Sequence, residues 1–232
     1  MSIIQQGKKL LGGNQGAISF FLGLYNHLPF NNQRKIKGRN NRLDFSRSLL
    51  KKNQISISGN DNQIVLGDRC TLRHCSIHIT GNGNSLIFGD KVAMISGEIH
   101  IEDDGNIINI GSHTSFLGKT HLASIEGTKI TIGENCLFSS DVVLRTGDSH
   151  SILNQSGQRI NPSEDITLAN HVWVGNRAIL TKGASVAQDS VVATGAILTS
   201  AVTEPGVVIG GVPAKVIKQG INWDISRKIL SK

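Results

Sequence analysis

Apolar side chains recur every six residues in the second half of the chain. From Leu168 onward every sixth residue is apolar, and the residue two places earlier is small or aliphatic; the two columns are Leu168, Val174, Leu180, Val186, Val192, Leu198 and Ile166, Val172, Ala178, Ala184, Ser190, Ala196. A period of six matches neither the 3.6-residue period of an α-helix nor the two-residue alternation of a strand. It predicts coils of three short strands around a triangular core, which is a parallel β-helix.

The first half of the chain repeats with a longer period. Glycines recur at one constant spacing, in register with two apolar columns; the three sets are Gly67, Gly89, Gly111, Gly133, then Ile64, Leu86, Ile108, Ile130, then Leu72, Met94, Phe116, Phe138. We interpret this longer period as three hexapeptides plus four residues that bulge at one corner, where turn sequences such as Ser-Gly-Asn stand. About seven coils are expected, and their stacking makes the core because no coil buries its own apolar face.

The repeat predicts an all-β protein with one continuous domain. We expect a partly helical N-terminal cap over residues 1–45, the β-helix over 46–202 with a loop at 145–165, and a C-terminal segment with a short helix over 203–232. The 26 glycines and the 4% aromatic content suit a fold with many turns and no bulky core. Three cysteines make no disulfide framework, and neither a secretory signal nor a long apolar run is present, so a cytoplasmic setting is expected.

Positive charge is concentrated at the N-terminus. Residues 1–52 contain ten Lys/Arg and one acid, Asp44, a net charge of +9, so the rest of the chain carries −2 of the total of +7. The apolar stretch Ala17 to Leu28 predicts a short helix that ends near Pro29. It could cap the first coil, touch the anionic headgroups of the inner membrane face, or meet an acidic polymer, and these roles are compatible. No aromatic residues interleave with the charge, so nucleic acid is not expected.

The prism is interrupted once, by the polar stretch Arg145 to Asp165. Loops on a rigid scaffold are favoured positions for catalytic groups. His150 stands near its start, and a histidine is the natural general base near neutral pH. A histidine in a loop is also commonly just solvated, so periodicity alone does not assign it a role.

The stretch from Ala169 to Lys218 resembles the C-terminal half of the hexapeptide-repeat acyltransferases, above all the galactoside, maltose and polysaccharide O-acetyltransferases. The segments VWVG (Val172 to Gly175) and GGVPAKVIK (Gly210 to Lys218) are specific to that group. The resemblance is good over about Thr128 to Lys218, covers Asn40 to Gly127 only as repeat architecture, and leaves 1–39 unmatched. It implies a left-handed helix, because a six-residue spacing does not reveal handedness.

The resemblance also implies a mechanism. His150, in TGDSH (Thr146 to His150), matches the family's general base, which deprotonates an acceptor hydroxyl for direct attack on acetyl-CoA in a ternary complex. The backbone N–H of Asn176 matches the oxyanion donor. Trp173 walls the thioester end or the sugar face, or alternatively only fills a corner. His171 replaces a residue that is usually Asn, and we expect it to be a solvent-facing turn residue rather than a second catalytic group.

Further positions match the family's ligand contacts. For CoA these are Trp173, Gly175, Asn176, Thr194, Gly195, Thr199, Ser200, Lys215 and Lys218; the two lysines match positions that face phosphates. His113, Thr120, His121, Glu126 and Asp148 are candidate contacts to a saccharide acceptor, and Glu126 or Asp148 is a candidate to orient His150. No metal is expected. A homotrimer is implied, with sites between subunits, and three basic N-termini favour an anionic polymer as acceptor.

The sequence leaves other functions open. The acceptor could be a small galactoside, an antibiotic or an amino sugar instead of a surface polysaccharide. A β-helix metal site of the carbonic anhydrase type would need His113, His121 and His150 from neighbouring chains around zinc, but the close spacing of the second and third ligands is missing.

Overall fold

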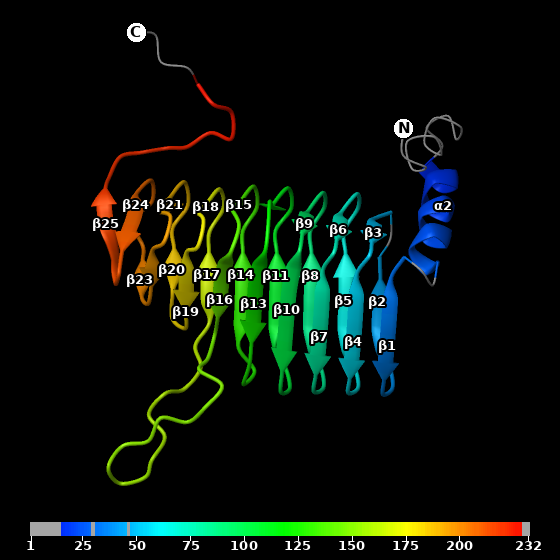
Figure 1. Ribbon diagram of the computed structural model, residues 1–232, viewed down its shortest axis with the longest axis horizontal. Coiled ribbons are helices and arrows are strands. Elements are labelled where there is room, and N and C mark those ends of the chain that lie inside the picture. Colours follow the sequence, from blue (N-terminus) through cyan, green and yellow to red (C-terminus); the bar gives the residue numbers. More distant parts are fainter. Residues whose placement is uncertain (1–14, 29–30, 46, 229–232) are drawn as a thin grey trace.

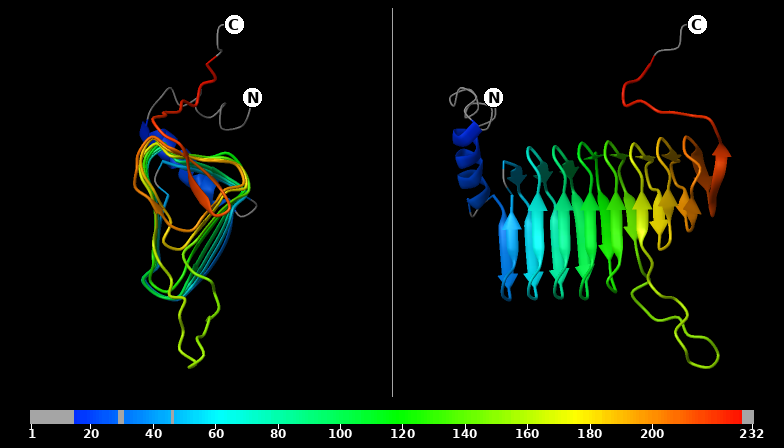
Figure 2. Two further views of the ribbon diagram at one scale, coloured as in Figure 1. Left: turned by 90° about the vertical axis from the view of Figure 1, so that its left-hand side faces the viewer. Right: turned by 180° about the vertical axis from the view of Figure 1, so that it is seen from behind.

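The protein forms a parallel β-helix that is triangular in cross-section (Figure 2, left). The computed structural model describes residues 15–28, 31–45 and 47–228. The single helix of this part, α2 (Gln15–His27), lies at one end of the prism, and the C-terminal segment leaves from the other (Figure 1). The predicted architecture is therefore confirmed.

Three sheets, called A, B and C, make the three faces. Sheet A contains β1 (Gln33–Lys37), β4 (Gln54–Ser58), β7 (Ser76–Thr80), β10 (Gly97–Glu102), β13 (Thr120–Ser124), β16 (Val142–Arg145), β19 (Ile179–Thr181) and β22 (Ile197–Leu198). Sheet B contains β2 (Arg42–Asp44), β5 (Gln63–Leu66), β8 (Ser85–Phe88), β11 (Ile107–Ile110), β14 (Lys129–Ile132), β17 (Ile166–Leu168), β20 (Ser185–Val186) and β23 (Ala201–Val202).

Sheet C contains β3 (Leu49–Lys51), β6 (Thr71–Arg73), β9 (Ala93–Ile95), β12 (Ser115–Phe116), β15 (Leu137–Phe138), β18 (Trp173–Val174), β21 (Val191–Val192), β24 (Val208–Gly211) and β25 (Ala214–Lys218). All neighbouring strands are parallel except β24 and β25, which form an antiparallel pair. The chain passes through A, B and C in turn, so the sheets meet at three corners.

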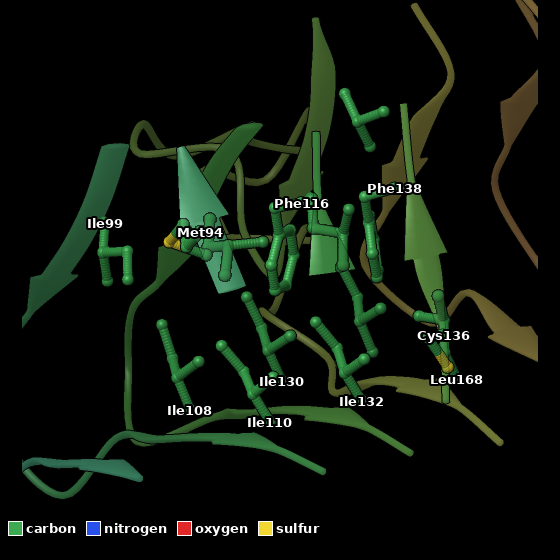
Figure 3. Packing of buried hydrophobic residues seen from close by; sticks show 14 of the residues in the cluster. Met94, Ile99, Ile108, Ile110, Phe116, Ile130, Ile132, Cys136, Phe138 and Leu168 are labelled. Carbon is green, nitrogen blue, oxygen red and sulfur yellow. The ribbon is translucent and has the colours of Figure 1, made fainter. Parts of the chain in front are cut away.

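The apolar columns of the sequence are the buried rungs of the prism. Phe116 stacks on Phe138 with ring centroids 4.5 Å apart, and both are fully buried beside Met94 and Ile130 (Figure 3). The column of regularly spaced glycines has a packing reason as well. A Cβ on Gly111 would lie 2.5 Å from the backbone carbon of Gly133 in the next turn, so a side chain at this position would collide with that turn.

The N-terminal segment closes the open end of the prism. Leu22 of α2 is buried. The side chain of Asn26 accepts a hydrogen bond from Leu50 N (2.9 Å) and donates one to Ser48 O (2.8 Å). These bonds satisfy backbone groups at the free edge of sheet C, where no further turn pairs with β3. Phe20 and Leu24 are exposed, and contact of this helix with lipid or polymer stays a prediction. Pro29, the expected helix end, lies outside the described residues.

Three details of the prediction were wrong. The prism begins at Gln33 rather than residue 46, because β1 already pairs with β4, and it has eight turns rather than seven. The expected C-terminal helix is absent from the described residues 219–228. This segment is held extended instead: Gly220 has a φ of +66°, Asp224 bonds the N–H and hydroxyl of Ser226, and Trp223 is bonded back to the prism.

Across the part of the chain that the structure describes, no helix is long and apolar enough to cross a membrane.

Candidate active site

The interruption in the repeat is a loop that leaves the prism between β16 and β17. It projects from the corner between sheets A and B, at the lower vertex of the end-on view (Figures 1 and 2). In the turns before the loop, residues that pair between successive turns are as widely separated in the chain as Ser85 and Ile107. In the turns after the loop, they are separated only as widely as Thr167 and Ser185. The loop therefore marks the change from wide to narrow turns.

A buried asparagine holds the start of this loop. Asn161 is 5% exposed, and its amide nitrogen donates to His150 O (2.8 Å) and to Asp148 Oδ2 (2.9 Å). Its amide oxygen accepts from Ile152 N (2.7 Å). One side chain thus holds the backbone at His150 and Ile152 and the carboxylate of Asp148.

Two ion pairs tie the loop to the prism. Arg159 makes a bidentate pair with Glu126 (2.5 and 3.1 Å), which also accepts from the hydroxyl of Ser163. These bonds lower the pKa of Glu126 to about 2, and the bond from Arg159 contributes most. Lys182 pairs with Asp148 at 2.6 Å and lowers the pKa of that carboxyl, with help from Asn161.

The side chain of His150 is exposed and takes no part in these contacts. Among the described residues, neither Glu126 nor Asp148 bonds its ring; their carboxylates hold the loop instead. The prediction that one of them orients the ring directly is therefore wrong for the single chain. What the structure provides is a fixed backbone under a ring that is accessible to another molecule.

Trp173 lies on the outer face of sheet C, between Leu137 and Val191 of the neighbouring turns. It is 38% exposed, and its Nε1 reaches Ser139 Oγ at 3.4 Å. The next corner is held by Asn176, whose side-chain amide donates to Ser140 O (2.7 Å) and Ser140 Oγ (2.8 Å). Among the described residues the backbone N–H of Asn176 has no acceptor.

His171 is not the solvated turn residue that the sequence predicted. It is half-buried, its Nδ1 lies 2.9 Å from Asp189 Oδ1, and its ring stacks on Trp223 with centroids 4.2 Å apart. The indole of Trp223 donates to His171 O (2.8 Å) and lies 6.1 Å from that of Trp173. Sequence reasoning missed Trp223, and the available signal was that the chain has only two tryptophans.

The positions expected to contact CoA lie at the C-terminal end of the prism. Thr194, Gly195, Thr199 and Ser200 are exposed at corners, and Lys215 and Lys218 are exposed on β25. Gly175 has a packing role, because a Cβ there would lie 2.7 Å from Thr194 N. Whether these residues bind CoA stays a prediction.

The predicted acceptor contacts do not form one cluster. His113 lies at the corner between sheets B and C, and its Nε2 meets Lys91 Nζ at 3.1 Å. His121 lies on the outer face of sheet A, 3.6 Å from Glu98 and beside the ring of His100. Thr120 is fully buried and its hydroxyl bonds Gly118 O, so the prediction that it contacts the acceptor is wrong.

One chain does not bring His150 and Trp173 together. The loop with His150 leaves one vertex of the triangular section, whereas Trp173 lies in sheet C, which does not reach that vertex (Figure 2, left). His113, His121 and His150 likewise lie at a corner, on a face and in the loop. No group of three His, Cys, Asp or Glu residues within the described ranges could hold a metal ion.

Comparison with known proteins defines the class of protein. No family model matches the chain. A polysialic acid O-acetyltransferase of Neisseria meningitidis is 31% identical over 189 residues, which are 81% of this chain and 87% of that protein. One of Escherichia coli O1:K1 is 36% identical over 95 residues, 40% of this chain; that match spans only 31% of the relative's length.

Solved structures agree. The crystal structure of a polysialic acid O-acetyltransferase superposes with a TM-score of 0.77 at 30% identity, covering 85% of this chain and 93% of the other. The chain belongs to the hexapeptide-repeat acyltransferase family and shares the left-handed β-helix of its polysialic acid O-acetyltransferases. The resemblance drawn from its sequence motifs is confirmed.

Proposed function

We propose that the protein transfers an acetyl group from acetyl-CoA to a hydroxyl of an anionic bacterial surface saccharide. The observation that carries this proposal is the similarity to a polysialic acid O-acetyltransferase, which extends over 81% of the chain. The rigidly held backbone of His150 supports it, since a general base must be positioned before its pKa matters.

The chemistry follows from the residues in place. The imidazole of His150 accepts the proton of the acceptor hydroxyl as the oxygen attacks the thioester carbonyl. The carbon–sulfur bond then breaks, the acetyl group becomes an ester, and the thiolate of CoA takes up the proton from the imidazolium. In this proposal the backbone N–H of Asn176, for which the described residues supply no acceptor, donates to the oxyanion that forms in between. No nucleophilic residue of the enzyme is needed.

The site requires more than one copy of the chain. His150 and Trp173 lie on separated parts of the prism, and the candidate CoA contacts lie exposed on its C-terminal turns. If the binding grooves of the active site form between neighbouring prisms, the loop of one copy contacts sheet C of the next copy. Closed rotational symmetry then makes all the sites equivalent. We propose a homotrimer, as the family resemblance implies.

Thiol release from acetyl-CoA tests the function. Purified full-length protein is mixed with acetyl-CoA and, in parallel, with polysialic acid, a neutral polysaccharide, a simple galactoside and an amino sugar. Release with polysialic acid, followed by the position of the new ester by NMR, is the expected result. Release only with the galactoside or amino sugar would replace the polymer by a small acceptor, and silence with all four would overturn the transferase proposal.

Mixed oligomers test the shared site. His150→Ala and Trp173→Ala proteins are each expected to be nearly inactive. When the two are unfolded together and refolded at equal amounts, about a quarter of the sites combine an intact His150 with an intact Trp173. Recovery of activity supports a site between copies, whereas no recovery despite verified mixing would place both residues in one chain's site or outside the mechanism.

A further inference from the structure

The helix α2 has an apolar side that faces away from the prism. Leu22 and Asn26, four residues apart, form the inner side, where Leu22 is buried and Asn26 bonds β3. Phe20 and Leu24 have the same spacing but lie about 200° around the helix from them. These two side chains are 72% and 57% exposed. The helix therefore presents a neighbouring apolar pair at the end of the molecule (Figure 1).

The space beside this apolar pair is open. Gly23 adjoins both Phe20 and Leu24 on the helix surface, and a Cβ on Gly23 would meet no heavy atom within 4 Å. Single exposed apolar residues are common on proteins, whereas neighbouring ones mark a candidate contact surface. The chemistry of the partner follows from the charge around the pair.

Positive charge is concentrated at this end of the prism. Residues 15–52, which include α2 and the first turn, contain eight Lys/Arg and one acid, Asp44. Residues 53–74 of the second turn add two cations and two acids, which leaves the excess unchanged. Residues 75–232 carry a net charge of −2. The excess therefore belongs to the end that α2 covers.

Most cations of the first turn are not neutralised by an acid. Arg42 pairs with Asp44, and Arg47 pairs with Asp68. The exposed cations that have no ion pair within the described ranges are Lys35, Lys37, Arg39 and Lys52. A helix with its side chains is about 10 Å thick, so a flat surface on the outer side of α2 lies about one Debye length from these cations. The long lysine and arginine side chains shorten that distance further.

Of three candidate partners, one matches both the apolar pair and the charge. A second copy that docked through the same surface would bring two strongly positive ends together. An acidic saccharide chain would satisfy the cations but would leave the exposed phenylalanine and leucine in water. An anionic lipid bilayer matches both features, because its headgroups are negative and the boundary with its acyl chains accepts apolar side chains.

We propose that this end of the molecule docks on an anionic lipid bilayer, with Phe20 and Leu24 at the headgroup boundary and the cations of the first turn above the headgroups. Two such signals are needed, because one weak anchor alone gives only marginal binding. The last turns of the prism then stand about 34 Å from the first, so the candidate CoA contacts stay accessible. The inference does not depend on the proposed function.

Co-sedimentation with lipid vesicles tests the docking without turnover. Full-length protein is mixed with vesicles of equal parts phosphatidylglycerol and phosphatidylethanolamine, and separately with neutral phosphatidylcholine vesicles. We expect binding to the anionic vesicles that weakens with added salt, and little binding to the neutral ones. Protein that stays in the supernatant with the anionic vesicles overturns the proposal.

Matched substitutions at the two ends of the prism locate the apolar contact. Phe20→Ser combined with Leu24→Ser is expected to weaken binding to the anionic vesicles about 10- to 100-fold. Val212→Ser combined with Ile217→Ser removes a similarly exposed pair (68% and 65%) from the far end and should leave binding unchanged. Equal effects of the two double variants would overturn the proposal.

Lysine substitutions make the same comparison for charge. Lys35→Gln combined with Lys37→Gln is expected to weaken binding about 30-fold. Lys215→Gln combined with Lys218→Gln removes the same charge from exposed positions of β25 and should have little effect. The net charge of the two double variants is identical, so a difference reports the position of the charge. Equal losses would reduce the binding to net charge and overturn the docking surface.

A fluorescent label on α2 provides a second measurement. The three native cysteines are free and no more than 2% exposed, so an environment-sensitive maleimide dye reacts selectively with a Leu24→Cys variant. Its emission is expected to shift to the blue on anionic vesicles, whereas the same dye on an Ile217→Cys variant should not respond. An unchanged emission in the Leu24→Cys variant would overturn the proposal.

The other partners give different results. If dissolved polysialic acid shifts the dye of the Leu24→Cys variant as strongly as the vesicles do, the surface binds an acidic polymer. If Phe20→Ser combined with Leu24→Ser lowers the oligomeric state in analytical ultracentrifugation, the surface is a contact between copies. Either result overturns the assignment to lipid.

Discussion

Asn161 donates a hydrogen bond of 2.8 Å to the backbone carbonyl of His150, eleven residues earlier in the same loop. The donor is buried, and the side chain of the acceptor residue is exposed. The proposed base is thus placed through its backbone, while its side chain stays free for substrate.

Asn161→Asp is predicted to lower kcat about 10- to 100-fold, because a small misplacement of a reacting group has effects of this size. The change keeps the oxygen that accepts from Ile152 N, removes both donated bonds, and places a second carboxylate beside Asp148. The KM for acetyl-CoA should not change. Steady-state kinetics in both substrates provide the measurement.

The matched control is Asn154→Asp in the same loop. Asn154 shapes the loop tip mainly by accepting bonds from Ser156 N and Gln158 N, and Asp retains that oxygen. It should keep nearly full activity. If both variants lose activity equally, the loop has a general need for neutral side chains, and Asn161 is not a specific positioning residue.

His150→Ala is predicted to cut kcat by about 10²- to 10⁴-fold, the usual range for loss of a general base. The thermal midpoint should stay within error of the wild type, since only the backbone carbonyl of His150 is bonded to the rest of the described chain. Activity and a melting curve on the same preparation test both parts. Wild-type turnover in this variant would remove His150 from the mechanism.

Much of the fold could be predicted because the buried residues of successive turns recur at a constant spacing in the sequence. Ile55, Ile77 and Ile99 are evenly spaced along the chain and pair in register in sheet A. The first turn escaped prediction because Arg34 of β1 breaks the apolar column, standing where Ile55 stands one turn later. Ile36, in register with Ile57, keeps the pattern, but a single apolar residue does not reveal a turn. A turn that is covered by a helix does not need the core pattern.

The site was less predictable than the fold. The position of the loop could be predicted because the sequence repeat stops there. The hydrogen bonds by which Asn161 holds the loop could not be predicted, since Asn161 has no partner at a repeat spacing and bonds backbone groups of other loop residues. The stack of His171 on Trp223 joins two distant positions of the chain through a segment without repeats. Such contacts depend on where an irregular segment returns to the prism, which no local pattern encodes.

Lys215→Ala is predicted to raise the KM for acetyl-CoA several-fold and to spare kcat at saturating acetyl-CoA, because an exposed ammonium binds a phosphate without touching the reacting carbonyl. Lys129→Ala, an exposed lysine at the start of β14, is the control and should leave both constants unchanged. An unaffected KM in Lys215→Ala would assign this lysine to the solvated surface.

The ion pair between Glu126 and Arg159, here called the clamp, predicts that the loop opens as the pH falls. The folded-state pKa of Glu126 is lowered from 4.5 to about 2, so the clamp contributes fully above pH 4.5 and is lost as the pH falls toward 2. Within this window, pepsin should cut the loop increasingly fast at its exposed Ile152 and Leu153. In Glu126→Gln the charge is absent at every pH, so cleavage should already be fast at pH 4.5, and the ratio of wild-type to variant rates corrects for the pH dependence of pepsin itself. That ratio should rise toward one as the pH approaches 2; a ratio that stays constant across the window would mean that Glu126 does not control the loop.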